Sequence, residues 1–143
     1  MKIDYSKNEF SSDEKEYLLN EAKVLNIKNP NFIPIIIQLD SNVLSIEKYK
    51  FLVPDNITYN NFINTILKKK LKCNNNFIYN SEILLINVVN GNKLNSIKEP
   101  QLKNIKDFYL ENHDEETNLL ILRVSRQTSY KYLKKSLLYF IGY

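Results

Sequence analysis

The sequence predicts an α+β domain with a β-grasp order of elements and an added N-terminal helical segment. Three observations support this class. An apolar hairpin opens the domain, an amphipathic helix crosses over after it, and two further apolar strands follow. The length of 143 residues and the hydrophobic content of 43% are enough for one buried core. We therefore expect one β-grasp domain at 32–130, a helical extension at 1–31 and a tail at 131–143.

A capping box predicts where the first helix begins. The Ser11 hydroxyl can accept a hydrogen bond from the backbone of Glu14, and the Glu14 carboxylate can return one to the backbone of Ser11. The helix is expected to extend to about Asn26 and to end before Asn29-Pro30-Asn31. Its apolar side chains recur at helical spacing, at Leu18, Ala22 and Leu25.

Two runs of apolar and β-branched residues predict the hairpin. Residues 32–39 form the first run, which is typical of a buried strand. The polar residues 40–42 indicate a turn, and 46–53 is expected to be the second arm. The Pro-Asp-Asn sequence at 54–56 ends that arm.

The crossover helix is expected from about Thr58, directly after the hairpin. Phe62, Ile66 and Leu67 would form its inward stripe. The lysines within 68–72 fall in its last turn, where the helix dipole favours cations. A nucleic-acid patch is the alternative for these lysines, but no aromatic residues interleave with them. A solvated helix end is therefore favoured, and no nucleic-acid partner is expected.

The second half of the chain contributes two strands and a short helix. Residues 82–89 are expected to form the third strand, which ends in a turn at Gly91, because glycine tolerates the positive φ of such turns. A short helix is expected around 101–110, and 118–124 is expected to form the last strand. The complete order is that of a β-grasp domain preceded by a helix.

Composition and charge favour a cytoplasmic binding protein over an enzyme. The net charge of +4 suits acidic peptides or anionic membrane surfaces. The single cysteine, Cys73, fits a reducing compartment, and we recognise neither a signal peptide nor a membrane span. Cys73 and His113 form no nucleophile–base motif. The acidic turn 114–116 lacks calcium-loop spacing, so we expect it to be solvated. No catalytic residue, cofactor or metal is therefore expected.

The most distinctive block of the chain is Lys50-Phe51-Leu52-Val53-Pro54, followed by Ile57-Thr58 and Phe62. Residues 33–37 form a Val/Ile-type strand with an internal proline, and 113–116 form an acidic turn before the last strand. In this order, and with an N-terminal arm at 1–10, these blocks resemble the ubiquitin-like autophagy modifiers of the GABARAP type. The resemblance covers roughly residues 1–130. It implies a ubiquitin-like fold for the β-grasp domain.

The resemblance also implies that the protein binds receptor peptides by β-augmentation. In this family an acidic–aromatic–x–x–aliphatic motif adds a strand to the exposed edge of the second hairpin arm, which here includes Phe51. By position, the pocket for the aromatic side chain (the aromatic pocket) is lined by Glu21, Leu25, Pro34, Lys50, Leu52 and Leu119. The pocket for the aliphatic side chain (the aliphatic pocket) is lined by Val53, Pro54, Ile57, Phe62 and Ile66. The cations expected to attract the acidic residues are Lys48, Lys50 and Lys69.

Three positions depart from the family pattern. Phe32 stands where the family usually has a basic residue, and Leu119 stands where a Phe is expected. Thr65 occupies a position at which a Leu would complete the aliphatic pocket. These replacements imply a missing electrostatic contact at Phe32 and pockets of altered depth or selectivity.

The end of the sequence leaves the attachment to membranes open. Members of the family end, after processing by a cysteine protease, in an aromatic residue and a Gly that conjugation enzymes join to a membrane phospholipid. An ungapped alignment places Tyr130 on that aromatic residue and Lys131 on that Gly. Gly142, followed by Tyr143, is the other candidate. Two interpretations stay open: the lipid is attached at Gly142, or lipid conjugation has been lost.

The tail at 131–143 has the composition of a basic amphipathic helix, because apolar residues interleave with lysines. It would either lie on a membrane or pack its apolar side against the domain. We expect an autophagy modifier that is cytoplasmic and is attached to autophagosomal or related organelle membranes by lipid conjugation. The alternatives are a conjugation-incompetent adaptor that uses the tail, and a modifier joined to a protein lysine.

Overall fold

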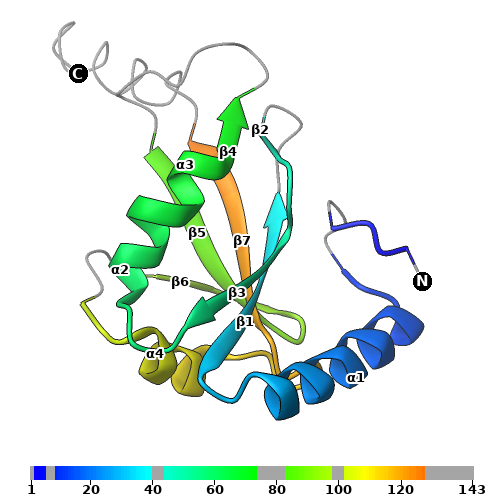
Figure 1. Ribbon diagram of the computed structural model, residues 1–143. Helices are drawn as coiled ribbons and strands as arrows, with labels where there is room; N and C mark the ends of the chain where they lie inside the picture. Colours follow the sequence, from blue (N-terminus) through cyan, green and yellow to red (C-terminus); the bar gives the residue numbers. More distant parts are fainter. Residues whose placement is uncertain (1, 6–8, 40–43, 74–82, 98–101, 128–143) are drawn as a thin grey trace, which may run out of the picture.

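The computed structural model describes residues 2–5, 9–39, 44–73, 83–97 and 102–127 (Figure 1). The α+β class with a β-grasp order is confirmed, and the expected helices and strands are present with shifted ends. Three strands, β2, β4 and β6, were not expected as separate elements. The elements in chain order are α1 (Ser12–Lys28), β1 (Phe32–Leu39), β2 (Leu44–Ile46), β3 (Lys50–Pro54), α2 (Tyr59–Asn61), the π-helical segment η1 (Phe62–Leu67), α3 (Lys68–Lys70), β4 (Leu71–Cys73), β5 (Ile83–Asn90), β6 (Lys93–Ser96), α4 (Ile105–Asn112) and β7 (Leu120–Gln127).

The main sheet has five strands in the order β3-β1-β7-β5-β6. β1 and β7 are parallel, and the other neighbouring strands are antiparallel. The last strand of the sequence, β7, therefore lies at the centre of the sheet. The helical segments α2, η1 and α3 cover one face, and α1 crosses the other (Figure 1). A second sheet of two strands pairs β2 with β4.

The capping box at the start of α1 is confirmed. The Ser11 N–H donates to Glu14 Oε1 at 2.9 Å, and the Glu14 N–H donates to Ser11 Oγ at 3.2 Å. The helix continues past Asn26 to Lys28, and the Asn29 N–H closes it by donating to the Leu25 carbonyl at 2.8 Å. These local bonds define the two ends of α1.

The second arm of the hairpin, expected as one strand at 46–53, is divided in two. β3 pairs with β1, with Leu52 opposite Pro34. β2 pairs instead with β4, with Ile46 opposite Leu71. Both Ile46 and Leu71 are buried in the main core, so the separate pairing closes one end of that core. Local sequence patterns do not encode such a choice of partner.

The crossover helix begins as expected, because Thr58 Oγ1 caps α2 by accepting a backbone hydrogen bond at 3.0 Å. It then widens into η1 and ends at Lys70. The prediction that Lys72 belongs to the last turn of this helix is wrong, because Lys72 lies in β4. Ile63 is buried and Ile66 is only half-buried, because the wider π-helical winding moves the inward stripe away from a 3.6-residue repeat.

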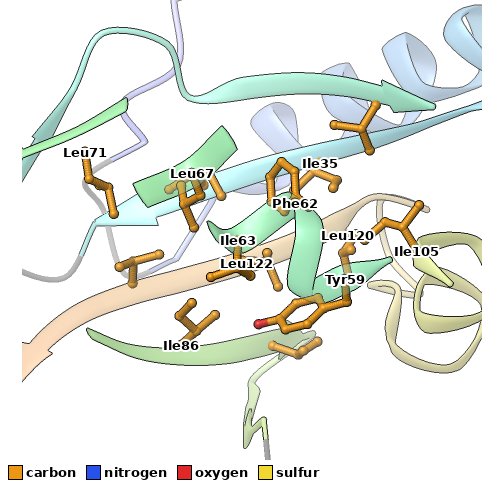
Figure 2. Packing of buried hydrophobic residues seen from close by; sticks show 14 of the residues in the cluster. Ile35, Tyr59, Phe62, Ile63, Leu67, Leu71, Ile86, Ile105, Leu120 and Leu122 are labelled. Atoms are coloured by element: carbon orange, nitrogen blue, oxygen red, sulfur yellow. The ribbon is translucent and has the colours of Figure 1, made fainter. Parts of the chain in front are cut away.

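The main core lies between the sheet and the segment α2–η1 (Figure 2). Tyr59 and Phe62 are fully buried there, and Figure 2 shows them among aliphatic side chains of the strands, including Ile35 and Leu122. Tyr59 also stacks on Phe108 of α4, with ring centroids 4.3 Å apart. This stacking connects α4 to the same core.

A smaller core lies on the other face, beneath α1. The Tyr5 ring stacks on Tyr49, with centroids 5.3 Å apart, and meets the Phe10 ring edge-on at 6.1 Å. Tyr5 and Phe10 of the N-terminal arm therefore pack against the domain. The buried residues of this smaller core are Phe10, Leu18, Ala22, Ile36, Leu119 and Ile121.

The turn predicted at Gly91 joins β5 to β6, and Gly91 has a φ of 60°. Its N–H donates to Asp114 Oδ1 at 2.7 Å, and Asp114 Oδ2 accepts bonds from the Thr117 N–H at 3.0 Å and Oγ1 at 2.6 Å. The expectation of a solvated acidic turn is therefore wrong for Asp114, which is 3% exposed. Glu115 and Glu116 are exposed. Asp114 is buried because its carboxylate satisfies the donors of two turns.

Candidate functional site

A pocket of about 190 Å³ opens between α1 and β3. It brings together all six residues that the sequence assigns to the aromatic pocket, although these residues lie far apart in the chain. Their role in peptide binding stays a prediction. The lining consists of these six, Glu21, Leu25, Pro34, Lys50, Leu52 and Leu119, together with Leu18, Ile35, Ile36 and Phe51.

The alternation of β3 decides which of its side chains reach the aromatic pocket. Lys50 and Leu52 lie on the α1 face of the sheet and are exposed, whereas Val53 lies on the opposite face and is buried in the main core. On α1, Glu21 and Leu25 are one turn apart and form the facing wall. The pocket is therefore a slot between a helix and the edge of a sheet.

An ion pair spans this slot. Lys50 Nζ donates to Glu21 Oε1 at 2.9 Å and to Oε2 at 3.1 Å, and it lies 6.0 Å from the ring centroids of both Tyr5 and Tyr17. Burial lowers the pKa of Lys50, but hydrogen bonds to Glu21 and Tyr5 outweigh it, so the pKa lies above its ordinary value. A raised lysine pKa means that the pair is fully present at neutral pH and is lost only at alkaline pH.

Among the described residues, β3 is the outermost strand on one side of the main sheet. Two backbone hydrogen bonds flank the strand. The Ile37 N–H of β1 donates to the Tyr49 carbonyl at 2.8 Å, and the Asp55 N–H donates to the carbonyl of Asn31, just before β1, at 3.0 Å. Bonded residues alternate along an antiparallel ladder. The N–H and C=O groups of Lys50 and Leu52, and the C=O of Pro54, therefore point outward from the sheet.

The residues assigned to the aliphatic pocket lie on the main-core side of β3 and at its end. Val53 and Phe62 are 3% and 0% exposed, so they belong to the interior of the main core. Ile57 and Ile66 are half-buried against that core, and Pro54 is exposed. The surface of this second site therefore comes from Pro54, Ile57 and Ile66.

The three lysines expected to attract acidic residues differ in position. Lys50 lines the aromatic pocket, whereas Lys48 lies between β2 and β3 and Lys69 lies in α3. All three are exposed. Gly142, the candidate for lipid conjugation, lies outside the described residues.

The sequence analysis missed the two tyrosines beside Lys50. Tyr17 precedes Glu21 by one helical turn, and this spacing is a signal that could have placed its ring next to the ion pair. Tyr5 reaches the same position only because the N-terminal arm packs against Tyr49. No local pattern predicts that contact.

No group of three or more His, Cys, Asp or Glu side chains in the described ranges is arranged to hold a metal ion. His113 stacks on Tyr109 with centroids 5.0 Å apart, at the end of α4, whereas β4, which contains Cys73, lies at the other end of the sheet (Figure 1). None of the helices in the described part of the chain is long and apolar enough to cross a membrane.

Comparisons with known proteins agree with this architecture. A family profile described as Autophagy protein Atg8 ubiquitin like matches residues 18–130. Autophagy-related protein 8h of Arabidopsis thaliana is 40% identical over 65 residues, which are 44% of this chain and 52% of that protein. The match thus spans about half the length of this curated relative. The crystal structure of Trypanosoma brucei ATG8 is similar with a TM-score of 0.58 and 20% identity, and the match covers 84% of this chain and 97% of that chain.

The structural likeness supports the ubiquitin-like fold, and the profile supports the family. The matched family consists of ubiquitin-like modifiers associated with autophagosomes rather than of enzymes. The profile covers most of α1 and the complete main sheet, including the edge strand β3. The chain therefore belongs to the Atg8 family of ubiquitin-like autophagy proteins.

Proposed function

We propose that this protein binds receptor peptides of the form acidic–aromatic–x–x–aliphatic as an added strand on β3. The observation that carries the proposal is the coincidence of an apolar slot with an open strand edge. The slot lies directly beside Lys50 and Leu52, whose backbone groups point outward. An extended peptide can satisfy those groups and insert a side chain into the slot at the same time.

The spacing of the motif fits the two faces of β3. In an extended strand, the first and fourth residues point to opposite faces. An aromatic first residue would enter the aromatic pocket on the α1 face, and an aliphatic fourth residue would lie on the other face near Ile57 and Ile66. The first residue lies beside Lys50 and Leu52 and the fourth beside Pro54, so the peptide runs parallel to β3.

The lysines beside β3 favour an acidic peptide, but the Glu21 carboxylate competes with that peptide for Lys50. Lys50 is engaged by Glu21 in the free protein. A peptide carboxylate near Lys50 must share that lysine with Glu21 or displace it. Lys48 is exposed nearby in the sequence and adds a second cation that favours approach of an acidic segment.

The test is a matched pair of double variants at the two edges of the sheet. Lys50→Glu with Leu52→Ala changes the β3 edge, and Lys93→Glu with Leu94→Ala makes the same changes on β6. Both leucines are exposed, at 38% and 49%, so both variants are expected to fold. Titration with a synthetic peptide of two Asp, one Trp, two Ser and one Leu measures the affinity. The β3 variant should bind at least about tenfold more weakly than the wild type.

The β6 variant has the same net charge as the β3 variant and should bind like the wild type. Equal affinity of the wild type and the β3 variant, with circular dichroism showing both folded, would remove the proposal. A loss in the β6 variant alone would move the site to the opposite edge.

The second proposal is conjugation to a membrane phospholipid through Gly142, carried out by autophagy conjugation enzymes after a cysteine protease exposes the glycine. It rests on family membership and on the position of Gly142 after the ubiquitin-like domain. Gly91 lies within the β5–β6 turn, where its N–H is bound to Asp114, so it serves the fold. Gly142 is the glycine that the sequence leaves for conjugation.

Intact mass of the protein from its own cells tests this second proposal. A species that ends at Gly142 and carries a phospholipid is the expected result, and Gly142→Ala should abolish it. An unmodified chain under conditions that induce autophagy would favour the conjugation-incompetent adaptor. Attachment to a lysine of another protein would favour a protein modifier instead.

A further inference from the structure

A second hollow, of about 400 Å³, lies between the C-terminal half of α1 and α4, beside the start of β1. Both helices lie at the same end of the sheet (Figure 1). None of the residues assigned to peptide binding except Pro34 lines it. Its volume is in the range typical of ligand pockets. We call it the end pocket; the residues used below are Lys23, Phe32, Lys106, Tyr109 and Leu110.

The end pocket combines exposed apolar side chains with polar ones. Phe32 and Leu110 both line it and are 39% and 58% exposed, so they offer apolar surface that a partner can bury. Tyr109 is fixed by its hydroxyl, which donates to the Asn118 carbonyl at 2.5 Å. Ala22, which is buried on the side of α1 that faces the sheet, also lines the pocket. The pocket therefore offers apolar surface beside a tyrosine held in place.

The charges around the end pocket have one sign. Its described lining contains the exposed lysines Lys23, on α1, and Lys106, on α4, and no carboxylate. By contrast, Lys103 near the start of α4 is paired with Glu111. An occupant of this pocket would gain from carrying carboxylates beside its apolar side chain.

The end pocket continues from the peptide edge. Pro34 lines both the aromatic pocket and the end pocket, and Phe32 is the cross-strand partner of Pro54, the last residue of β3. Directly opposite side chains in a sheet share a face. A peptide that runs parallel to β3 leaves the edge at Pro54, and only β3 then separates it from Phe32.

We infer that the end pocket receives the segment of a bound receptor peptide that follows its aliphatic residue. The segment places one apolar side chain between Phe32 and Leu110, and its carboxylates contact Lys23 and Lys106. This inference rests on the proposed peptide site. It assigns a specificity to this chain beyond the four-residue motif, because Phe32 makes the entrance apolar.

The length needed is short. Six extended residues span at most about 20 Å, which exceeds the roughly 10 Å of two strand spacings between a peptide on β3 and Phe32 on β1. The receptor peptides selected by this chain therefore carry an apolar residue and acidic residues within about six positions after the aliphatic one.

Three synthetic peptides test the inference. The first ends at the aliphatic residue; the second continues with six residues that contain one Phe and two Glu; the third continues with six Ser and Gly residues. The extended acidic peptide should bind the wild type about five- to tenfold more tightly than the other two. In Lys23→Glu with Lys106→Glu this gain should disappear, while the affinity for the short peptide stays within about twofold.

The matched control is Lys68→Glu with Lys93→Glu, which has the same net charge but changes exposed lysines outside the end pocket. It should keep the gain. Phe32→Ser should lose most of the gain without changing the short-peptide affinity. Equal binding of all three peptides to the wild type overturns the inference and leaves the proposed function intact. A gain that persists in the Lys23 and Lys106 variant also overturns it. Failure of every peptide to bind contradicts the proposed function itself.

Discussion

The two faces of the main sheet differ in how completely they are covered. On one face, α2 and η1 pack on β1, β3, β5 and β7, and the core holds Tyr59 and Phe62 without exposure. On the other face, the single helix α1 crosses the sheet and leaves a hollow on each side, the aromatic pocket and the end pocket. The smaller core lies only beneath the helix itself.

This difference indicates that the covered face determines stability and the partly covered face determines recognition. The covered face buries large side chains, and burial of that kind supplies most of the free energy of folding. The partly covered face keeps apolar walls in contact with solvent, where a partner can bury them. We therefore expect substitutions on the covered face to change the free energy of unfolding, and substitutions on the other face to change affinity.

The largest expected effect comes from the covered face. Phe62→Ala removes a ring with no exposed surface and leaves a cavity beside the Phe51 ring. The centroids of the Phe51 and Phe62 rings are 5.8 Å apart in the wild type. The free energy of unfolding should fall by about 3–5 kcal/mol. Urea denaturation followed by circular dichroism measures this change.

Leu52→Ala, on the binding edge, is the comparison, because this side chain is 38% exposed. Its free energy of unfolding should change by less than about 0.5 kcal/mol. If the free energy of unfolding fell by a similar amount in the two variants, it would be wrong to assign stability to one face and recognition to the other.

A smaller effect on stability is expected at the start of α1. Ser11→Ala removes the acceptor for the Glu14 N–H and should cost about 1 kcal/mol. Peptide affinity should stay within about twofold, because the pocket residues Glu21 and Leu25 lie well inside the helix. Thermal unfolding and peptide titration of the same sample test both statements. A large loss of affinity would show that the pocket depends on the helix end.

The smallest expected effect concerns the ion pair in the aromatic pocket. Glu21→Gln removes the carboxylate that competes for Lys50, so an acidic peptide should bind about two- to fivefold more tightly at low salt. A peptide without acidic residues should show no gain. Weaker binding of the acidic peptide would mean that Glu21 contributes to the site rather than competing with the ligand.

Local signals made much of the fold predictable. The capping box at Ser11 and Glu14 predicted the start of α1, and Gly91 predicted the β5–β6 turn, because each signal acts within a few residues. The pairing of β2 with β4 was not predictable in this way. This pairing depends on Ile46 and Leu71 packing at the same end of the main core.

The candidate site, too, was predictable only in part. The six residues of the aromatic pocket were identified through a family resemblance, which carries information on long-range contacts that local patterns lack. The end pocket had no such precedent, because it depends on Phe32 and on α1 and α4 both lying against β1. The buried role of Asp114 also escaped prediction, since Asp114 lies in the loop between α4 and β7 whereas its partner Gly91 lies in the β5–β6 turn.

The central place of β7 governs when the domain can fold. β7 pairs with β1 on one side and with β5 on the other, so it joins the N-terminal hairpin to the C-terminal one. A nascent chain that has not yet emerged beyond Leu120 has two unpaired halves and no continuous sheet. Such non-local pairing slows folding and exposes strand edges meanwhile. We expect the domain to fold only after synthesis has passed Gln127, and truncation before Leu120 to leave no stable fragment.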